Sequence, residues 1–427
     1  MNIYLFNDKD SSARFGIGTY LNELTQALQC EDVHVHIVHL HAIRPAFEIE
    51  TDRQNALTFP VENWYIPEVR NQNTFNGPLY KVELYFKNVI YLLRLHIRDT
   101  KDLVFHLNYN HCVELAKGLK EVFDCKIITT VHFMKWAFEL QGNLQKLHAI
   151  KSKPANQQNP FEKLLCTTDE YEGLLYKEAD RVIALSHNMK NLLCSEYHIE
   201  PEKITVIPNG LFDAYKTIVK HQIMPAKLSQ KAALRCKWRL SADESAILFA
   251  GHFLPVKGLV FLVRAFHTVL EKIPDCRLII AGNGQYDAYI REAKGVCAKI
   301  TFTGLLDRKE LFELYQLADV GVIPSLYETF GYVAIEMMMH ELPIVATATS
   351  GLNEVVDETC GLKVPVIESH DRIEIDTGLL AEKIIYMIKH PDEAMKMGSN
   401  GRKRFLKKYS LEIFQNNMLN FYNSITD

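Results

Sequence analysis

Short apolar runs alternate with amphipathic segments along most of this chain. Runs typical of β-strands occur in the first half at residues 3–6, 33–38, 103–107, 126–131, 181–185 and 204–207. They recur in the second half at residues 246–250, 277–281, 299–302, 320–323 and 343–346. Between these runs the apolar residues follow helical spacing, as in Tyr20, Leu21, Leu24, Ala27 and Leu28. Strands that alternate with helices predict an α/β fold with parallel sheets.

The pattern weakens near residue 211, and this break divides the chain into two α/β series. We therefore expect two facing, Rossmann-like, doubly wound domains, at residues 1–211 and 212–408. Residues 409–427 contain an apolar helix with no new strand, and we expect it to pack back on the first domain. Ligands of such sheets bind beyond the carboxyl ends of the strands. Candidate residues that directly follow strands are Gly16, Gly18, His132, Asn209, His252, Lys257, Gly282 and Glu328. Their placement predicts an active site in the cleft between the two domains.

Two parts of the first series are less regular. Between residues 133 and 176 the periodicity loosens, and the polar residues 152–160, with two prolines, are expected to form a mobile insertion. Residues 80–96 form an apolar helix that carries basic side chains, among them Lys87 and Arg94. We interpret it as a core helix whose basic side chains reach solvent, and peripheral binding to a membrane is the alternative.

Four histidines lie close together in and after the second strand-like run: His34, His36, His39 and His41. A metal site is one interpretation of this cluster. No nearby carboxylate or cysteine completes a ligand set, so a polar strand face is the favoured interpretation.

Composition and charge narrow the class of protein. At 427 residues the chain is long enough for two or three domains with separate cores. A formal net charge of −4 gives no reason to expect nucleic acid binding. The nine cysteines form no C-x-x-C pair and fit thiols in a reducing compartment. The chain opens on a strand-like run, without a basic segment or cleavage site, so we expect no signal peptide and a cytoplasmic protein.

The stretch from residue 324 to residue 336 carries the strongest chemical signal. Glu328 follows Pro324 and Ser325 in a turn-like segment, and Glu336 lies eight residues later in the next helix. Thr329 is the expected N-cap, and backbone N–H groups should be free at this helix start. Carboxylates beside such an end can hold the hydroxyls of one polyol ligand. The alternative is a strand–loop–helix crossover with a solvated glutamate at each end.

This stretch belongs to a longer series of motifs. They read VIPNG at residues 206–210, AGHFLPVKG at 250–258, PSLYETFGYVAIE at 324–336, LPIVAT at 342–347, SGLNEVV at 350–356 and YSL at 409–411. In this order and spacing the chain resembles, over nearly its whole length, the GT-B-fold retaining glycosyltransferases of family 4, the glycosyl transferases group 1. The resemblance implies two facing Rossmann-like domains with the active site between them.

The resemblance also implies an activity and a set of residue roles. The expected protein is a hexosyl- or related transferase of the EC 2.4 class, acting with retention of configuration and without a metal or cofactor. It would move a sugar from a nucleotide diphosphate sugar to an acceptor hydroxyl in surface glycan or glycoconjugate (polysaccharide) synthesis. The implied catalytic residues are Glu328, His132 and Lys257. The implied donor-binding residues are Gly16, Gly18, His252, Lys257, Leu305, Glu328, Thr329, Phe330, Gly331 and Glu336.

Each role follows the chemistry of the donor as the resemblance presents it. Lys257 would contact the diphosphate, Glu336 the ribose hydroxyls, and Glu328 the donor sugar, while His132 would reach that sugar from the first domain. Leu305 would flank the base. The acceptor would be a saccharide, lipid-linked or peptide hydroxyl, with peripheral contact at the inner face of the membrane as an option. The nucleotide base, the sugar and the acceptor are left open.

This chain also departs from the family pattern. His252 stands where the family usually has arginine, so its charge depends on pH. Met337 and Met339 replace small residues, which predicts altered packing. The departure at His252 keeps one alternative function open, a catalytically silent GT-B partner that stabilises another transferase. Three plainer interpretations also stay open: His132 as a hydrogen-bonded strand-end histidine, residues 282–284 as a simple turn, and Lys257 as a helix start.

Overall fold

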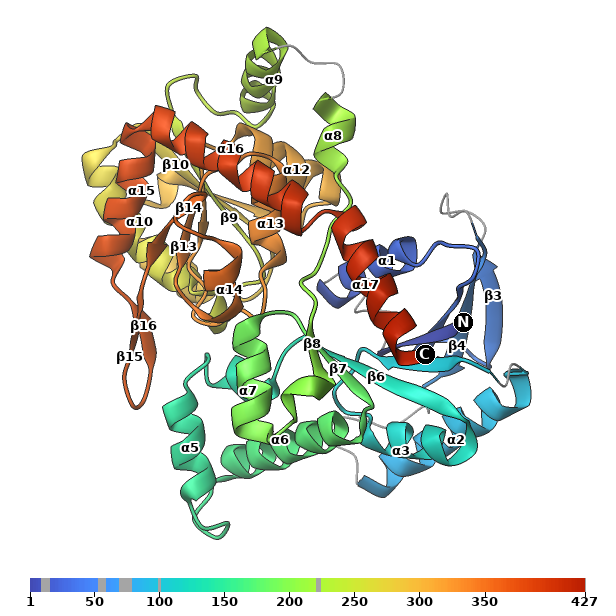
Figure 1. Cartoon of the computed structure of the whole chain (residues 1–427). Helices are drawn as coiled ribbons and strands as arrows, with labels where there is room; N and C mark the ends of the chain where they lie inside the picture. Colours follow the sequence, from blue (N-terminus) through green and yellow to red (C-terminus); the bar gives the residue numbers. More distant parts are fainter. Residues whose placement is uncertain (9–15, 53–58, 69–78, 99–100, 220–223, 427) are drawn as a thin grey trace. The chain divides into compact units, whose positions relative to one another are not determined.

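The computed structural model describes residues 1–8, 16–52, 59–68, 79–98, 101–219 and 224–426. The chain divides into two compact units (Figure 1). The first unit contains Met1–Lys135, Pro154–Gly210 and Leu411–Asp427, and the second contains Trp136–Lys153 and Leu211–Ser410. The chain thus changes unit at the predicted break near residue 211. The residues 136–153, which the sequence assigned to the first domain, group with the second unit.

An eight-stranded sheet forms the centre of the first unit. Its strands are β1 (Asn2–Asp8), β2 (His34–Ala42), β3 (Glu48–Asp52), β4 (Val61–Pro67), β5 (Leu103–Leu107), β6 (Cys125–Val131), β7 (Arg181–Ala184) and β8 (Ile204–Val206). Their order is β3-β4-β2-β1-β5-β6-β7-β8, and every neighbouring pair is parallel except β3 and β4. The helices of this unit are α1 (Gly16–Ala27), α2 (Leu79–His96), α3 (Val113–Val122), α6 (Pro160–Glu178), α7 (His187–Tyr197) and α17 (Leu411–Thr426).

A six-stranded parallel sheet forms the centre of the second unit. Its strands are β9 (Ser245–Ala250), β10 (Cys276–Ala281), β11 (Ile300–Gly304), β12 (Val320–Ile323), β13 (Ile344–Thr347) and β14 (Gly361–Val364), in the order β11-β10-β9-β12-β13-β14. A separate antiparallel hairpin joins β15 (Val366–Glu368) and β16 (Ile373–Ile375). The helices are α4 (Lys135–Glu139, which begins at the end of the first unit), α5 (Leu144–Ser152), α8 (Ala214–Val219), α9 (Met224–Lys237), α10 (Leu259–Lys272), α11 (Asp287–Glu292), α12 (Arg308–Leu317), α13 (Tyr332–Met339), α14 (Ser350–Val355), α15 (Thr377–Lys389) and α16 (Pro391–Lys408).

The central strands β1, β5, β9 and β12 are almost wholly buried, as parallel strands covered on both faces require, whereas the edge strand β3 is mostly exposed. All residues of β5 and β12 are buried. In the second unit α10 and α15 pack side by side, and their apolar faces join the core beneath the sheet (Figure 1). Burial of these faces stabilises the helices more than helix propensity alone can.

Helix α17 belongs to the first unit although it ends the chain. Its Phe414 packs edge-on against Tyr20 of α1, with ring centroids 5.8 Å apart. Tyr422 is completely buried, and its hydroxyl lies 2.6 Å from Nδ1 of His106 on β5. The apolar spacing of α17 therefore serves the core of the first unit (Figure 1).

Residues 133–176 are mostly helical, which the sequence analysis did not predict. The polar residues before α6 include its N-terminal cap: Asn159 accepts from the N–H of Glu162, and Glu162 accepts in return from the N–H of Asn159. Pro160 occupies the first helical position, where its missing N–H has no cost. The Asn-Pro-x-Glu sequence was thus a helix-start signal.

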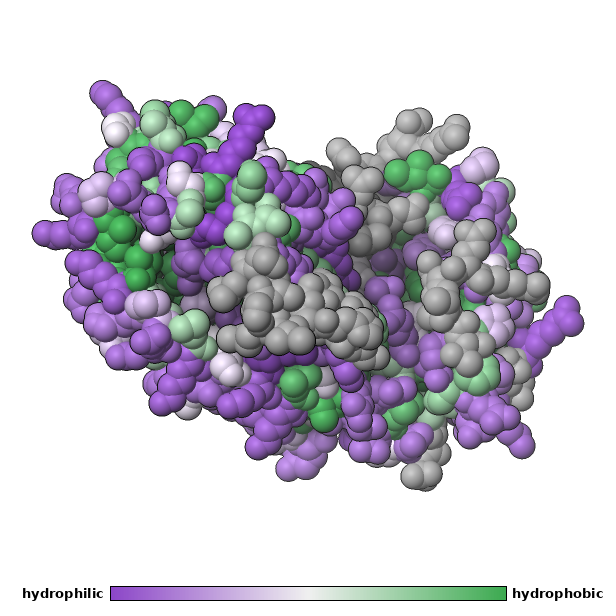
Figure 2. All heavy atoms as spheres, turned by 90° about the horizontal axis from the view of Figure 1, so that it is seen from above, coloured by the Kyte–Doolittle hydropathy of each residue, from purple (hydrophilic) through white to green (hydrophobic). Residues whose placement is uncertain are grey.

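The face drawn in Figure 2 is mostly hydrophilic, and its hydrophobic residues gather only in small groups. Among the described residues, no helix has both the length and the apolar character needed to span a bilayer.

Candidate functional site

The turn after β9 and the loop after β12 lie against each other in the second unit. Nζ of Lys257 donates to Oε2 of Glu328 at 2.6 Å. The hydroxyl of Ser325 donates to the same carboxylate oxygen at 3.2 Å. A backbone bond from the N–H of Leu326 to the carbonyl of Val256, 2.8 Å long, joins the two segments directly. Lys257 and Glu328 therefore form an ion pair on a common backbone frame.

Gly258 makes this close approach possible. Its φ is 64°, and a Cβ at this position would lie 1.8 Å from the carbonyl oxygen of Pro324. No side chain fits such a gap, and a left-handed φ favours glycine as well. The glycine after Lys257 thus fixes the lysine beside the loop that carries Glu328.

The ion pair stands where the strand order of the second sheet reverses. The chain runs outward from β9 through β10 to β11, then returns to place β12 on the other side of β9. Lys257 follows β9 and Glu328 follows β12, so the pair lies at the carboxyl ends of the two strands that flank the reversal. Doubly wound sheets bind their ligands at this switch point.

Two threonines near the end of β13 hold the Glu328 loop from its other side. The hydroxyl of Thr347 donates to the carbonyl of Ser325, and that of Thr349 donates to the carbonyl of Leu326 at 2.7 Å. Both threonines are buried. Thr347 ends the LPIVAT motif and Thr349 lies between two motifs, and neither was predicted to support the loop.

The second carboxylate, Glu336, has a different environment. Its Oε2 accepts a hydrogen bond of 2.8 Å from the hydroxyl of the buried Tyr315 on α12. Burial raises the pKa of Glu336 above its usual value. The side chain of Glu328, by contrast, pairs with a cation and is 16% exposed. The alternative of a solvated glutamate at each end is therefore wrong for both residues.

The start of α13 differs from the prediction in one respect. The N-cap residue is Gly331, with a φ of 103°, and it makes no side-chain capping bond. Thr329 lies two residues earlier, so its predicted role as the cap is wrong. The left-handed turn at Gly331 replaces a side-chain cap, and the first N–H groups of α13 receive no bond from a capping side chain.

His252 follows β9, and its surroundings keep it neutral. Partial burial lowers the pKa of the His252 imidazole below its usual range, and the nearby Lys257 ammonium acts in the same direction. The side chain of Asn283 opposes this shift through a hydrogen bond. Where a permanent arginine cation was expected from the family pattern, this chain therefore presents an uncharged ring at neutral pH.

The glycines after β10 bring two strand ends together. The N–H of Gly282 donates to the carbonyl of Gly304 at 3.0 Å, and a Cβ on Gly282 would meet the carbonyl of Gly251 at 1.8 Å. The segment 282–284 is thus more than a simple turn, because it packs tightly on the loop that carries His252. Leu305 follows β11 and Gly304, and 56% of its surface is exposed. It lies at the same edge of the sheet as Lys257.

In the first unit, the candidate residues again follow strands. Gly16 and Gly18 lie in the first turn of α1, and residues 9–15 before them lie outside the described residues. His132 follows β6, and its Nε2 lies 3.1 Å from Oδ1 of Asn108, the residue after β5. The His132 ring packs edge-on against Tyr20. Burial lowers its pKa to about 3, so the ring is neutral, with its Nε2–H donated to Asn108.

The histidines of β2 have partners that explain them without a metal. Nδ1 of His36 lies 2.9 Å from a carboxylate oxygen of Glu62, and a ring nitrogen of His39 lies 3.0 Å from the side-chain oxygen of Asn63. His41 stacks on Tyr85. Across the described ranges, no cluster of three or more histidine, cysteine, aspartate or glutamate side chains could hold a metal ion.

The methionines of α13 belong to the core. Met337, Met338 and Met339 are completely buried. A Cβ added to Gly321 on β12 would lie 2.4 Å from the sulfur of Met337. The missing side chain at Gly321 therefore makes room for the large residue at 337.

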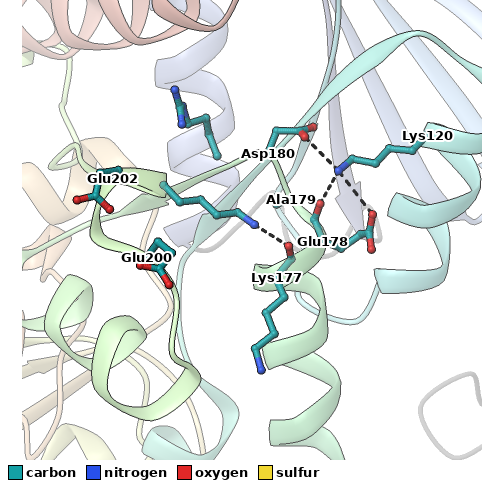
Figure 3. A pocket seen from close by; sticks show the side chains of 9 residues that line it. Lys120, Lys177, Glu178, Ala179, Asp180, Glu200 and Glu202 are labelled. Carbon is teal, nitrogen blue, oxygen red and sulfur yellow. Dashed lines mark hydrogen bonds and ion pairs between the residues drawn. The ribbon is translucent and has the colours of Figure 1, made fainter.

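A charged hollow occurs elsewhere in the first unit (Figure 3). Nζ of Lys120 lies 3.1 Å from a carboxylate oxygen of Asp180 and 3.5 Å from one of Glu178. Lys203 donates to the carbonyl of Lys177 at 2.6 Å. These residues surround the amino ends of β7 and β8, the opposite edge from the site residues. Paired charges at that edge do not favour it as the ligand site.

Comparisons with known proteins place the chain in a family. A sequence model described as Glycosyltransferase Family 4 matches residues 16–212, and one described as Glycosyl transferases group 1 matches residues 230–404. An uncharacterized glycosyltransferase of Methanocaldococcus jannaschii is 34% identical over 192 residues, which cover 43% of this chain and 46% of that protein. A D-inositol 3-phosphate glycosyltransferase of Mycobacteroides abscessus is 29% identical over 260 residues, 58% of this chain and 55% of that protein. The chain thus spans about half the length of these curated relatives.

Solved structures give the fold over the full length. Sucrose-phosphate synthase from Thermosynechococcus elongatus aligns with a TM-score of 0.71 and 21% identity, covering 99% of this chain and 98% of that one. Anabaena HepE, solved in complex with UDP, aligns with a TM-score of 0.69 and 16% identity, covering 99% and 100%. The motifs, the two parallel sheets and these matches agree: the chain is a member of the GT-B-fold glycosyltransferases of family 4, the glycosyl transferases group 1.

Proposed function

We propose that this protein is a retaining, metal-independent glycosyltransferase that moves a sugar from a nucleotide diphosphate sugar to an acceptor hydroxyl. The observation that carries the proposal is the ion pair between Lys257 and Glu328 at the switch point of the second sheet. A cation and a carboxylate that lie side by side suit the two parts of a nucleotide diphosphate sugar, the diphosphate and the sugar. The phosphates need positive charge, and the sugar hydroxyls need an acceptor.

The leaving group decides how these residues act. When the bond between sugar and diphosphate breaks, positive charge develops on the sugar and negative charge on the phosphates. In the proposed complex the Lys257 ammonium turns from Glu328 to the diphosphate, and Glu328 accepts from hydroxyls of the donor sugar. The N–H groups of residues 329–331 add donors beside the same sugar.

The remaining roles are assigned by position. Glu336 would exchange its bond with Tyr315 for the ribose hydroxyls, while His252 would face the diphosphate and Leu305 the base. In the first unit, the backbone at Gly16 and Gly18 would border the phosphates. His132, neutral and held by Asn108, would reach the donor sugar from the first unit.

Retention requires no separate base in this proposal. The bond from the acceptor oxygen to the anomeric carbon forms on the face from which the diphosphate leaves. The acceptor proton passes to the departing phosphate oxygen. Proton NMR of the product distinguishes retention from inversion, and activity that persists in EDTA supports metal independence. An inverted anomeric configuration contradicts the mechanism.

The donor assignment is tested by a panel of UDP, GDP and ADP sugars. At least one nucleotide should raise the melting temperature and be released on turnover with acceptor. Glu328→Ala should lower kcat/KM by at least about 100-fold, because a preorganised partner of the transition state is lost. The matched control is Glu292→Ala, which removes a surface ion pair with Arg264 in the same unit and should leave kcat/KM unchanged.

The alternative, a catalytically silent GT-B partner that stabilises another transferase, keeps support from the neutral His252 in place of arginine. The same panel separates the two functions. Thermal stabilisation by none of the nucleotides favours the silent partner, whereas turnover of any donor excludes it. Synthesis of a surface glycan or glycoconjugate is the proposed setting, with a saccharide, lipid-linked or peptide acceptor.

We also propose peripheral contact between α2 and the inner face of the membrane. One face of this helix enters the core through Tyr85, Phe86, Val89, Ile90 and Leu93. The other face leaves Leu84, Tyr91 and Leu95 exposed by 55%, 64% and 56%. Apolar and aromatic side chains on the outer face of an amphipathic helix suit the membrane interface.

Sedimentation with anionic liposomes tests this contact. Tyr91→Glu combined with Leu95→Glu should move the protein from the pellet to the supernatant. Leu164→Glu on α6 replaces an equally exposed leucine (58%) and should leave sedimentation unchanged. Wild-type protein that stays in the supernatant with both anionic and neutral liposomes contradicts the proposal.

A further inference from the structure

A buried acid on α6 lies beneath the loop that carries His132. Glu172 is completely buried. Its Oε1 accepts from the side-chain amide of Asn110 at 3.2 Å. Both carboxyl oxygens lie 3.3–3.4 Å from the N–H of Lys135, the first residue of α4. One carboxyl group therefore joins α6 to two loops of the first unit.

Asn110 extends this contact to the residue after His132. Its side-chain N–H₂ also donates to the carbonyl of Phe133 at 2.7 Å. Asn108, two residues before Asn110, accepts from the His132 ring. The loop after β5 thus binds the segment 132–135 at the His132 ring and at the backbone of Phe133. Glu172 in turn accepts a hydrogen bond from Asn110 of that loop.

Taking a carboxyl group out of water is costly, and its presence in the core needs a reason. The groups that face Glu172 are Asp169 on its own helix, Tyr197 on α7 and the backbone and ammonium of Lys135. Burial raises the pKa of Glu172 to about 8, so the acid is largely protonated at neutral pH. An apolar residue would fill the same space without this cost but could not accept from Asn110 and Lys135.

We propose that Glu172 is a positioning residue for the reaction: through Asn110 and the Lys135 N–H it fixes the segment 132–135 and hence the direction of the His132 ring. The inference rests on the proposed function, in which His132 contacts the donor sugar. Nucleotide contacts are assigned to other residues, so Glu172 acts on the chemical step rather than on donor affinity.

Chain geometry offers a matched control on the same helix. Asp169 is also buried, 2% exposed, and accepts from the hydroxyl of Tyr197 at 2.6 Å. Asp169→Asn therefore changes a second buried acid, whose hydrogen bond leads to α7, and Glu172→Gln changes one oxygen of the support.

The experiment compares Glu172→Gln, Asn110→Ala and Asp169→Asn in the full-length protein. Steady-state kinetics with the nucleotide sugar should show kcat lowered about 10- to 100-fold in the first two variants, because a small displacement of a reacting contact has an effect of this size. Their donor KM should stay within about twofold of wild type. Asp169→Asn should retain wild-type kcat.

Hydrogen exchange supplies a readout independent of activity. The peptide that contains residues 132–140 should exchange faster in Glu172→Gln and Asn110→Ala than in wild type, and at the wild-type rate in Asp169→Asn. The inference is overturned if Glu172→Gln has the same kcat and the same exchange rate in residues 132–140 as Asp169→Asn. If Glu172→Gln does not fold, Asn110→Ala decides by the same criteria. A wild-type protein that transfers no sugar contradicts the proposed function, whereas unchanged exchange in the variants contradicts this inference alone.

Discussion

Replacing Gly321 by alanine should disturb the packing of α13 on the second sheet. The new Cβ would lie 2.4 Å from the sulfur of Met337, 2.9 Å from its terminal methyl and 3.1 Å from a methyl of Leu342. Met337 is completely buried, so its side chain cannot swing into solvent. Overpacking by one methyl group costs about 1–3 kcal/mol. We expect the free energy of opening of α13 to fall by this amount.

The cause can be isolated by a double-mutant cycle. Met337→Ala alone leaves a cavity and should cost about 2–5 kcal/mol. In the double variant the alanine methyl at 321 enters part of this cavity, so its overpacking cost disappears. The double variant should be no less stable than Met337→Ala, which corresponds to a coupling energy of about 1–3 kcal/mol.

Hydrogen exchange of peptides from α13 is the suitable assay, because it reports the opening of this segment without assuming one transition for a two-unit chain. Met395 is 63% exposed and provides the control. Met395→Ala should add independently to Gly321→Ala. Additivity within about 0.5 kcal/mol for Gly321 and Met337 would refute the argument that the glycine accommodates the methionine.

Three further predictions concern the second unit. Burial lowers the pKa of His252 below 6.5, so the affinity for a nucleoside diphosphate should rise as pH falls through that range. In calorimetry, His252→Arg should bind the nucleoside diphosphate more tightly at neutral pH, and its affinity should depend less on pH. Equal pH profiles of the two proteins contradict a charge role for His252. Gly258→Ala places a side chain at a φ of 64° and against the carbonyl of Pro324. It should lower the free energy of unfolding by about 3 kcal/mol or more and abolish nucleotide-induced thermal stabilisation. A melting temperature equal to that of wild type would show that the loop can move aside. Arg402→Ala removes both bonds of 2.6 and 2.8 Å to Asp213 and should lower the free energy of unfolding in denaturant by about 3–5 kcal/mol. Adding Asp213→Ala to the same chain should recover part of this loss of stability. A loss below about 1 kcal/mol for Arg402→Ala would mean that solvent screens the pair.

The sequence was most informative where a local pattern has a local consequence. Apolar runs of four to six residues predicted the strands β9 and β12 at the switch point of the second sheet, because buried parallel strands need no long-range information to be recognised. The spacing from Glu328 to Glu336 placed one acid in a loop and the other in a helix, which the structure confirms. The sequence also shows Gly258 within a motif, but it does not show why glycine is needed there. The carbonyl of Pro324, which leaves no room for a side chain at residue 258, lies far away in the sequence.

Features that depend on distant partners could not be predicted in this way. Thr347 and Thr349 support the Glu328 loop through carbonyls about 22 residues earlier, which no periodicity encodes. The buried Glu172 interrupts an otherwise ordinary helix pattern, and only the fold reveals its two acceptor bonds. Thr329 was assigned as a cap because its residue type favours that position, whereas backbone conformation at Gly331 decided the helix start.

The way the chain passes between the two units has a consequence for protein engineering. It crosses at residues 135/136, 153/154, 210/211 and 410/411, so no single cut separates the units. A fragment that ends at residue 210 lacks α17, whose Tyr422 closes over His106 in the first core. A fragment that begins at residue 211 lacks α5, whose cap Asn143 bonds to the carbonyl of Ser369. To obtain either unit alone, a designer would have to rejoin distant pieces through new linkers, for example by fusing residues 411–427 ahead of residue 1.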